Sequence, residues 1–220
     1  MLKKMNMVAL TLLLALPFFT FAQDSSFGNW LIYIGNKKLD SKWNIHNEVQ
    51  YRSYNIGDDL EQLLIRTGVG YNLTENNNNI LLGYGYILSQ NYVDDTEDKV
   101  SINEHRIFQQ FTTKQTVGSV GLSHRYRFEQ RFIEDDYKMR FRYFLGFNIP
   151  ITKKESNSYY LSAYNEIFLN TESSVFDRNR VYGGLGYKVN KSLRIEAGYM
   201  NQFFESNNRD QFNIITYLNF

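Results

Sequence analysis

Arginine recurs at alternate positions in several segments of this sequence, most densely in HRYRFEQRF, which begins at His124. Arg125, Arg127 and Arg131 share one parity with Glu129, and tyrosine and phenylalanine fall between them. A guanidinium group is permanently charged and presents a planar fork of donors. Such a segment could therefore hold carboxylates in bidentate ion pairs or attract anionic solutes.

Charged residues of the same parity occur along most of the chain. The predicted charge lattice consists of Glu48, Arg52, Arg66, Glu104, Arg106, Arg125, Arg127, Glu129, Arg131, Arg140, Arg142, Glu166, Arg178, Arg180, Arg194 and Glu196. Three interpretations are open. The lattice could fill a closed barrel, its surplus cations could line a narrow, porin-like path that favours anions, or they could bind a specific acidic ligand.

Catalytic chemistry has fewer candidates. The histidines are His46, His105 and His124. Ser123 adjoins His124, but neighbours on a strand point to opposite faces, so they cannot act as nucleophile and base. We interpret His46, which shares parity with Glu48, as an interior histidine. The sequence has no cysteine and shows no metal cluster or phosphate loop, so we expect no catalytic residues, metal or cofactor; a lipid-hydrolysing outer-membrane enzyme is the alternative.

The elements that would position these charges are strands, because apolar and polar residues alternate with a period of two. The segments are 43–53, 62–73, 80–89, 118–131, 138–149, 158–170, 178–189, 192–204 and 211–220, with 101–112 and 28–35 more ambiguous. A soluble sandwich would also alternate. Here, however, the polar face is rich in Arg, Glu, Gln, Asn, Gly and Ser, which is typical of the inside of a membrane barrel.

The N-terminus indicates the compartment. A basic start, an apolar run and small residues before Gln23 predict a signal peptide over 1–22, with a barrel domain over 23–220. The absence of cysteine excludes a lipidation site and a disulfide framework. A net charge of +1 gives no argument for nucleic acid as a partner. We therefore expect the outer membrane of a Gram-negative bacterium.

The expected connections alternate in charge along the chain. Acidic ones, at 58–59, 94–98, 134–136, 172–177 and 205–210, alternate with basic or neutral ones at 37–38, 76–79, 114, 153–154 and 190–191. Alternate connections of an up-and-down barrel emerge on the same side, and the longer ones face outward in this class. The loop at 94–98 could take divalent cations or contact lipopolysaccharide, or simply be a solvated loop.

The last segment, QFNIITYLNF, carries Phe212, Ile214, Leu218 and a terminal Phe220 on one parity. This pattern is similar to the insertion signal of bacterial outer-membrane barrels, so the barrel-insertion machinery is an expected partner. Outer-membrane lipid and lipopolysaccharide are the others. We expect a monomeric, antiparallel, up-and-down transmembrane β-barrel of about 10 to 12 strands, because the segments number about eleven whereas single-chain bacterial barrels have an even count. Either 28–35 is not a usual membrane strand, or two strands have been merged.

Several short stretches resemble a known family. They are FGNW from Phe27, KWNIHNEVQYR from Lys42, EHR from Glu104, HRYRFEQR from His124, RFR from Arg140 and RNRVYGG from Arg178. Together the sequence resembles the uncharacterised family called domain of unknown function 2490. The resemblance implies an outer-membrane barrel, largely of Bacteroidota, and implies no reaction.

Overall fold

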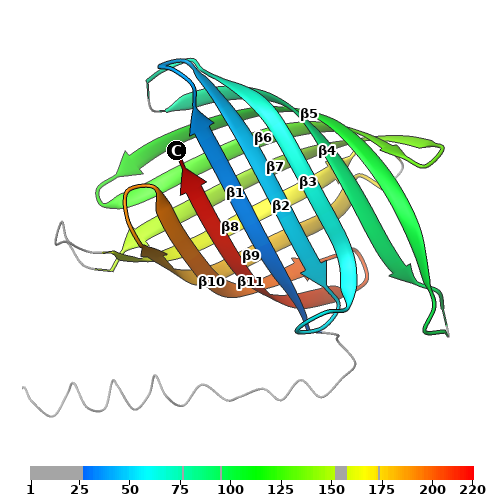
Figure 1. The fold of residues 1–220 in the computed structure, drawn as a ribbon. Coiled ribbons are helices and arrows are strands. Elements are labelled where there is room, and N and C mark those ends of the chain that lie inside the picture. The colour runs from blue at the N-terminus through cyan, green and yellow to red at the C-terminus, as the bar shows by residue number, and fades with distance from the viewer. Residues whose placement is uncertain (1–26, 76, 95, 152–157, 173) are drawn as a thin grey trace, which may run out of the picture.

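The chain folds as a closed β-barrel in a computed structural model that describes residues 27–75, 77–94, 96–151, 158–172 and 174–220 (Figure 1). The strands are β1 (Gly28–Lys38), β2 (Trp43–Ser53), β3 (Leu60–Asn72), β4 (Asn78–Tyr92), β5 (Lys99–Val117), β6 (Val120–Ile133), β7 (Asp136–Pro150), β8 (Tyr159–Asn170), β9 (Phe176–Lys188), β10 (Leu193–Phe203) and β11 (Asn208–Asn219). The expected all-β barrel is confirmed. In the ranges that the structure describes, no helix is long and apolar enough to cross a membrane.

The barrel closes with eleven strands, and neither adjustment of the strand count is needed. Strands that follow one another in the chain pair antiparallel, as expected. The closing pair differs: β1 pairs with β11 in parallel, from Gly28 opposite Gln211 to Asn36 opposite Asn219. With an odd number of alternating strands, the first and last must run in the same direction, and Figure 1 shows their arrows side by side and pointing the same way.

The strands carry apolar side chains outward and polar side chains inward. Outward residues such as Leu82, Phe141 and Leu161 keep half or more of their surface exposed. Inward residues such as Glu129 and Arg127 are buried. Because side chains of a strand alternate between its two faces, the period of two in the sequence becomes an apolar wall around a charged interior.

Tight turns join several neighbouring strands. Gly118 begins the turn between β5 and β6 with a φ of 61°, a conformation that glycine adopts without steric cost. Glu134 takes the same place between β6 and β7, with a φ of 47°. Its side chain accepts a hydrogen bond from the backbone N–H of Asn103, at 2.5 Å, which fixes this less favourable conformation.

The turns divide the barrel into two rims. The acidic rim comprises the turns β2–β3, β4–β5, β6–β7, β8–β9 and β10–β11, and carries Asp58, Asp59, Asp94, Glu97, Asp98, Glu134, Asp135, Glu172 and Glu205. The lysine rim comprises the other turns and the adjoining strand ends, and carries Lys37, Lys38, Lys42, Lys188 and Lys191. The predicted signal peptide over 1–22, and Asn76, Asp95, Lys153 and Lys154 of the predicted loops, lie outside the described residues.

Candidate functional site: the charged interior of the barrel

The centre of the interior is Glu129 on β6, whose side chain is fully buried. One carboxylate oxygen accepts hydrogen bonds from Arg140 at 2.7 and 3.1 Å, and the other accepts one from Arg142 at 2.7 Å. Arg127 lies 3.7 Å from the same carboxylate. The register places Glu129 directly opposite Arg140 on β7, with Arg127 opposite Arg142. Alternate residues of two adjacent strands therefore meet on one inner face.

A chain of ion pairs extends from this centre across four strands. Arg142 also donates to Glu166 on β8, at 2.7 Å, and Glu166 accepts a second bond from Arg125, at 2.7 Å. In the other direction, Arg140 pairs with Asp177 on β9, at 2.7 Å, and Asp177 pairs with Arg178, at 3.1 Å. Each shared carboxylate pairs with more than one arginine, so the ion pairs form one connected network in which cations outnumber anions.

Two smaller groups complete the ion pairs. Glu104 on β5 accepts hydrogen bonds from Arg106 and from Arg131, the latter at 2.6 and 3.0 Å. Glu48 on β2 accepts one from Arg66 on β3, at 2.7 Å. Arg106 and Arg131 lie directly opposite one another. Their shared carboxylate offsets the repulsion that two like charges would otherwise produce.

Four predicted lattice residues form no ion pair in the described part of the chain: Arg52, Arg180, Arg194 and Glu196. Arg52 donates to Gln50 and Gln62, each at 2.6 Å, and Arg180 donates to Gln202 at 2.7 Å. Glu196 accepts a hydrogen bond from the hydroxyl of Tyr160, at 2.8 Å. The structure therefore brings most of the predicted charges together, but it leaves these four without an ion-pair partner among the described residues.

Aromatic rings inside the barrel contact the arginines. The indole of Trp30 contacts both Arg52, at 3.7 Å from the ring centroid, and Arg180, at 4.8 Å. The ring of Phe168 has Arg142 at 4.4 Å and Arg180 at 4.6 Å. The negative face of an aromatic ring attracts a cation. These rings therefore supply part of the stabilisation that carboxylates would otherwise supply.

Sequence reasoning missed these rings, as well as Asp177, Gln202 and Gln211. The buried residues that it did not place inside include Trp30, Ile32, Leu64, Leu81, Ile87, Phe108, Tyr160, Phe168, Tyr182, Met200, Gln202, Gln211, Asn213 and Ile215. A signal was present in the parity: Phe108 shares its face with Arg106, and Phe168 with Glu166. Because these residues are apolar, they were expected on the outer face in spite of their parity.

A cavity of about 520 Å³ occupies the half of the lumen next to the lysine rim. All eleven strands contribute to its wall, among them Asn44, Lys114, Arg125, Tyr164 and Arg194. We call this cavity the vestibule.

Toward the acidic rim, the vestibule ends at a layer of buried side chains. This sealing layer consists of Arg52, Leu64, Ile87, Phe108, Glu129, Phe168, Gln202 and Gln211, none more than 7% exposed and none part of the vestibule wall. Ile87, Phe108 and Glu129 have no accessible surface. The glycine opposite Phe108, Gly83, makes room for the ring, because a Cβ there would collide with it. The half of the lumen next to the lysine rim is thus hollow, and the sealing layer beyond it is packed with side chains.

The histidines lie on different faces. His46 is inside, with its Nε2 3.5 Å from a carboxylate oxygen of Glu48. His105 and His124 contact the hydroxyls of Tyr84, at 2.6 Å, and Tyr143, at 2.9 Å. Ser123, by contrast, lines the vestibule. Among the described residues, no group of three or more His, Cys, Asp or Glu side chains could hold a metal ion.

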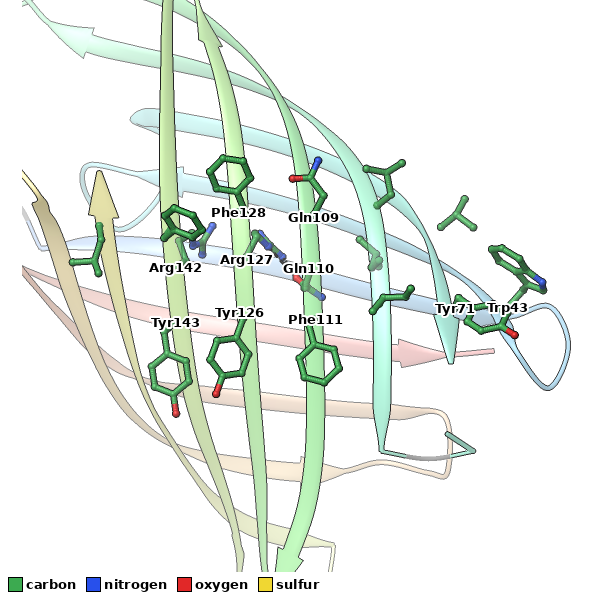
Figure 2. Close-up of a pocket in the computed structure, with 16 residues that line it drawn as sticks. Trp43, Tyr71, Gln109, Gln110, Phe111, Tyr126, Arg127, Phe128, Arg142 and Tyr143 are labelled. Carbon is green, nitrogen blue, oxygen red and sulfur yellow. Dashed lines mark hydrogen bonds between the residues drawn. The ribbon is translucent and has the colours of Figure 1, made fainter. Parts of the chain in front are cut away.

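The outer wall carries an apolar groove of about 850 Å³ over β2 to β8. Figure 2 shows Phe111, Tyr126 and Tyr143 side by side on β5, β6 and β7, in agreement with the register. On β11, Phe212 and Ile214 are 38% and 39% exposed, Leu218 is partly exposed, and Phe220 follows the strand and is 52% exposed. The predicted insertion signal therefore lies on the outward side.

The fold and its interior define a closed β-barrel with inverted polarity, apolar outside and ionic inside. A family model described as a protein of unknown function, DUF2490, matches residues 27–213, and the chain belongs to this family. The expected family assignment is thereby confirmed. No curated protein matches the chain.

Proposed function

We propose that this protein is an integral, non-enzymatic β-barrel of the outer membrane of a Gram-negative bacterium, with a lumen sealed toward the acidic rim. The observation that carries the proposal is the inverted polarity. The outward residues Ile65, Leu82 and Phe141 are 48%, 59% and 53% exposed, whereas Arg66 and Arg142 inside are 3% and 7% exposed. An apolar surface of this extent is unfavourable in water and favourable in lipid.

The direction of the arginines agrees with a bilayer around the barrel. An arginine on the lipid face at the bilayer midplane costs about 2 to 4 kcal/mol. The arginines of the central strands are instead buried inside, where carboxylates, glutamines and rings solvate them. Only helices and closed barrels satisfy all their backbone groups within a membrane.

The same proposal includes the partners. Outer-membrane lipid and lipopolysaccharide would surround the wall, and the barrel-insertion machinery would recognise the outward residues of β11. Closure of β1 on β11 leaves no free strand edge in the barrel, which supports a monomer. The predicted removal of residues 1–22 belongs to the same route of export.

The two tryptophans of the sequence allow a direct test. Trp30 is buried inside at 2% exposure, and Trp43 is 45% exposed on the outer wall. In vesicles of lipids brominated near the headgroup, a Trp30→Phe variant, which retains Trp43, should lose most of its fluorescence to quenching. A Trp43→Phe variant, which retains Trp30, should be quenched little. Equal quenching of the two variants would contradict the proposed orientation.

Conductance in a planar bilayer tests the sealed lumen. Protein shown to be folded by a heat-dependent shift in gel mobility should give no steady current, because the sealing layer leaves no accessible surface on Phe108. A Phe108→Ala, Phe168→Ala double variant removes two rings of that layer and should give intermittent steps. Steady anion-selective steps from the unaltered protein would instead establish the narrow pore.

A further inference from the structure

The vestibule carries a surplus of positive charge. Its wall includes the cations Lys38, Arg66, Lys114, Arg125, Arg127, Arg142, Arg180 and Arg194, against the carboxylates Glu48, Glu75, Glu166 and Glu196. Carboxylates pair with Arg66, Arg125, Arg127 and Arg142. Among the residues that the structure describes, the other wall cations, Lys38, Lys114, Arg180 and Arg194, form no ion pair, so the uncompensated positive charge of the lumen lies with these four.

The least compensated cations lie on opposite walls. Lys114 on β5 and Arg194 on β10 are close enough for their charges to repel one another. The side chain of Arg194 forms no hydrogen bond or ion pair within the described ranges; its guanidinium instead stacks on the ring of Tyr217, at 3.9 Å from the centroid. Stacking fixes the flat face of a guanidinium and leaves its N–H edge available.

A buried arginine at the inner end of the vestibule is also incompletely partnered. Arg127 is only 3% exposed and lines the vestibule. Its Nε and Nη2 donate to Gln110, at 2.9 and 2.6 Å, whereas its Nη1 has no hydrogen-bond partner. A buried guanidinium donor left without an acceptor costs about 1 to 3 kcal/mol or more. This Nη1 is itself buried and lies 3.7 Å from Glu129, so Arg127 adds positive charge to the inner end of the vestibule without offering a donor to its space.

A different wall presents neutral groups. The side chains of Asn36, Asn44, Asn72 and Asn79, from β1 to β4, form a connected row with hydrogen bonds of 2.7 and 2.8 Å. All four line the vestibule. Carboxamides both donate and accept. This row can bind hydroxyl or amide groups of a ligand whose charge lies toward the cations.

We propose that the vestibule is a binding site for a small organic anion, a carboxylate or phosphate that also carries hydroxyl or amide groups. Lys114, Arg125 and Arg194 contact the anionic group, and the asparagine row contacts the remainder. The volume of about 520 Å³ lies within the range of roughly 300 to 1,000 Å³ of small-molecule sites. The proposal rests on the proposed function, because a lumen sealed toward the acidic rim leaves the lysine rim as the entrance to the vestibule.

Titration calorimetry on the folded full-length barrel in neutral detergent, at low ionic strength, tests the site. Citrate and inorganic phosphate are the probes. We expect saturable binding of citrate that weakens as sodium chloride is added. Arg194→Gln and Lys114→Gln should each weaken it about tenfold, which corresponds to the loss of one charge-assisted contact.

Lys191 provides the matched control, because it is an exposed lysine of the same rim, in the β9–β10 turn, that does not line the vestibule. Lys191→Gln should bind citrate as the unaltered protein does. An equal loss in Lys191→Gln would show that the charge of the rim, not the vestibule, attracts the anion. That result would overturn the proposal, as would the absence of saturable binding of both probes.

A competition arm separates two sources of the anion. Displacement of citrate by a short-chain phosphatidic acid, added below its micellar concentration, would identify a lipid headgroup. Binding of citrate that this lipid does not displace would identify a soluble metabolite. Calorimetry in detergent does not depend on the membrane, whereas bromine quenching does. Failure of the anion site would therefore leave the proposed location intact, and the reverse also holds.

Discussion

Glu129→Gln would measure how much the ionic interior contributes to stability. The glutamine has the same shape and keeps one carbonyl oxygen, but it has no charge and places an amide N–H₂ against a guanidinium. Glu129 accepts three hydrogen bonds, from Arg140 and Arg142. It is fully buried, so water does not replace the lost interactions.

The size of the expected decrease in stability depends on the ion pairs that Arg140 and Arg142 retain in the variant. Removing one partner of a buried ion pair costs about 3 to 5 kcal/mol. Arg140 retains Asp177 and Arg142 retains Glu166, both at 2.7 Å. Because these second carboxylates remain, we expect the lower end of the range, a decrease of about 3 kcal/mol in the free energy of unfolding.

Urea unfolding in lipid vesicles, followed by gel mobility and by tryptophan fluorescence, measures this free energy. Glu97→Gln is the control, since Glu97 is an exposed carboxylate of the β4–β5 loop. The free energy of unfolding of Glu97→Gln should differ from that of the unaltered protein by less than about 0.5 kcal/mol. A Glu129→Gln barrel as stable as the unaltered one would refute the view that shared carboxylates hold the arginine network together.

Two further predictions concern packing and a turn. Gly83→Val should lower the free energy of unfolding by about 1 to 3 kcal/mol, because its Cβ collides with the buried ring of Phe108; the same urea assay measures this, and unchanged stability would show that the ring can move. Hydrogen bonds from the backbone N–H groups of Trp43 and Lys42 lower the pKa of Asp40. Asp40 therefore stabilises the folded state at pH values above the pKa of its carboxyl in the unfolded chain, and this stabilisation is lost as the pH falls through the lower pKa of the folded state. The urea midpoints of Asp40→Ala and the unaltered protein should accordingly converge in acid. A difference between the midpoints that persists in acid would assign the effect to another group.

The inside and outside of most strands could be predicted, because one face of each carried charges. Glu104 and Arg106, for example, share a face that no membrane barrel would turn to lipid. The same reasoning was ambiguous for β1, where Trp30 and Ile32 point inward while Leu31 points outward. Both faces of that strand are apolar, so alternation carried no information about direction.

The ion-pair partners of individual charged residues were harder to predict from the sequence. Asp177 was expected to end the acidic connection over 172–177, whereas β9 already begins at Phe176. The pairing of β8 with β9 shifts register at Phe168 and Leu169, and passes from Arg178 to Phe176. Asp177 is thus the extra residue of a bulge, which lets its carboxylate reach Arg140 inside. A register shift depends on the pairing of two strands and leaves no mark in either segment alone.

The parallel pairing of β1 with β11 has a consequence for how the chain is connected to its surroundings. In an even-stranded barrel the first strand begins and the last strand ends at one rim. Here Gly28 begins β1 at the acidic rim and Asn219 ends β11 at the lysine rim. A reporter joined before Gly28 and another joined after Phe220 would therefore stand on opposite faces of the barrel. The fold can therefore tether a different partner on each face of the barrel through one continuous polypeptide.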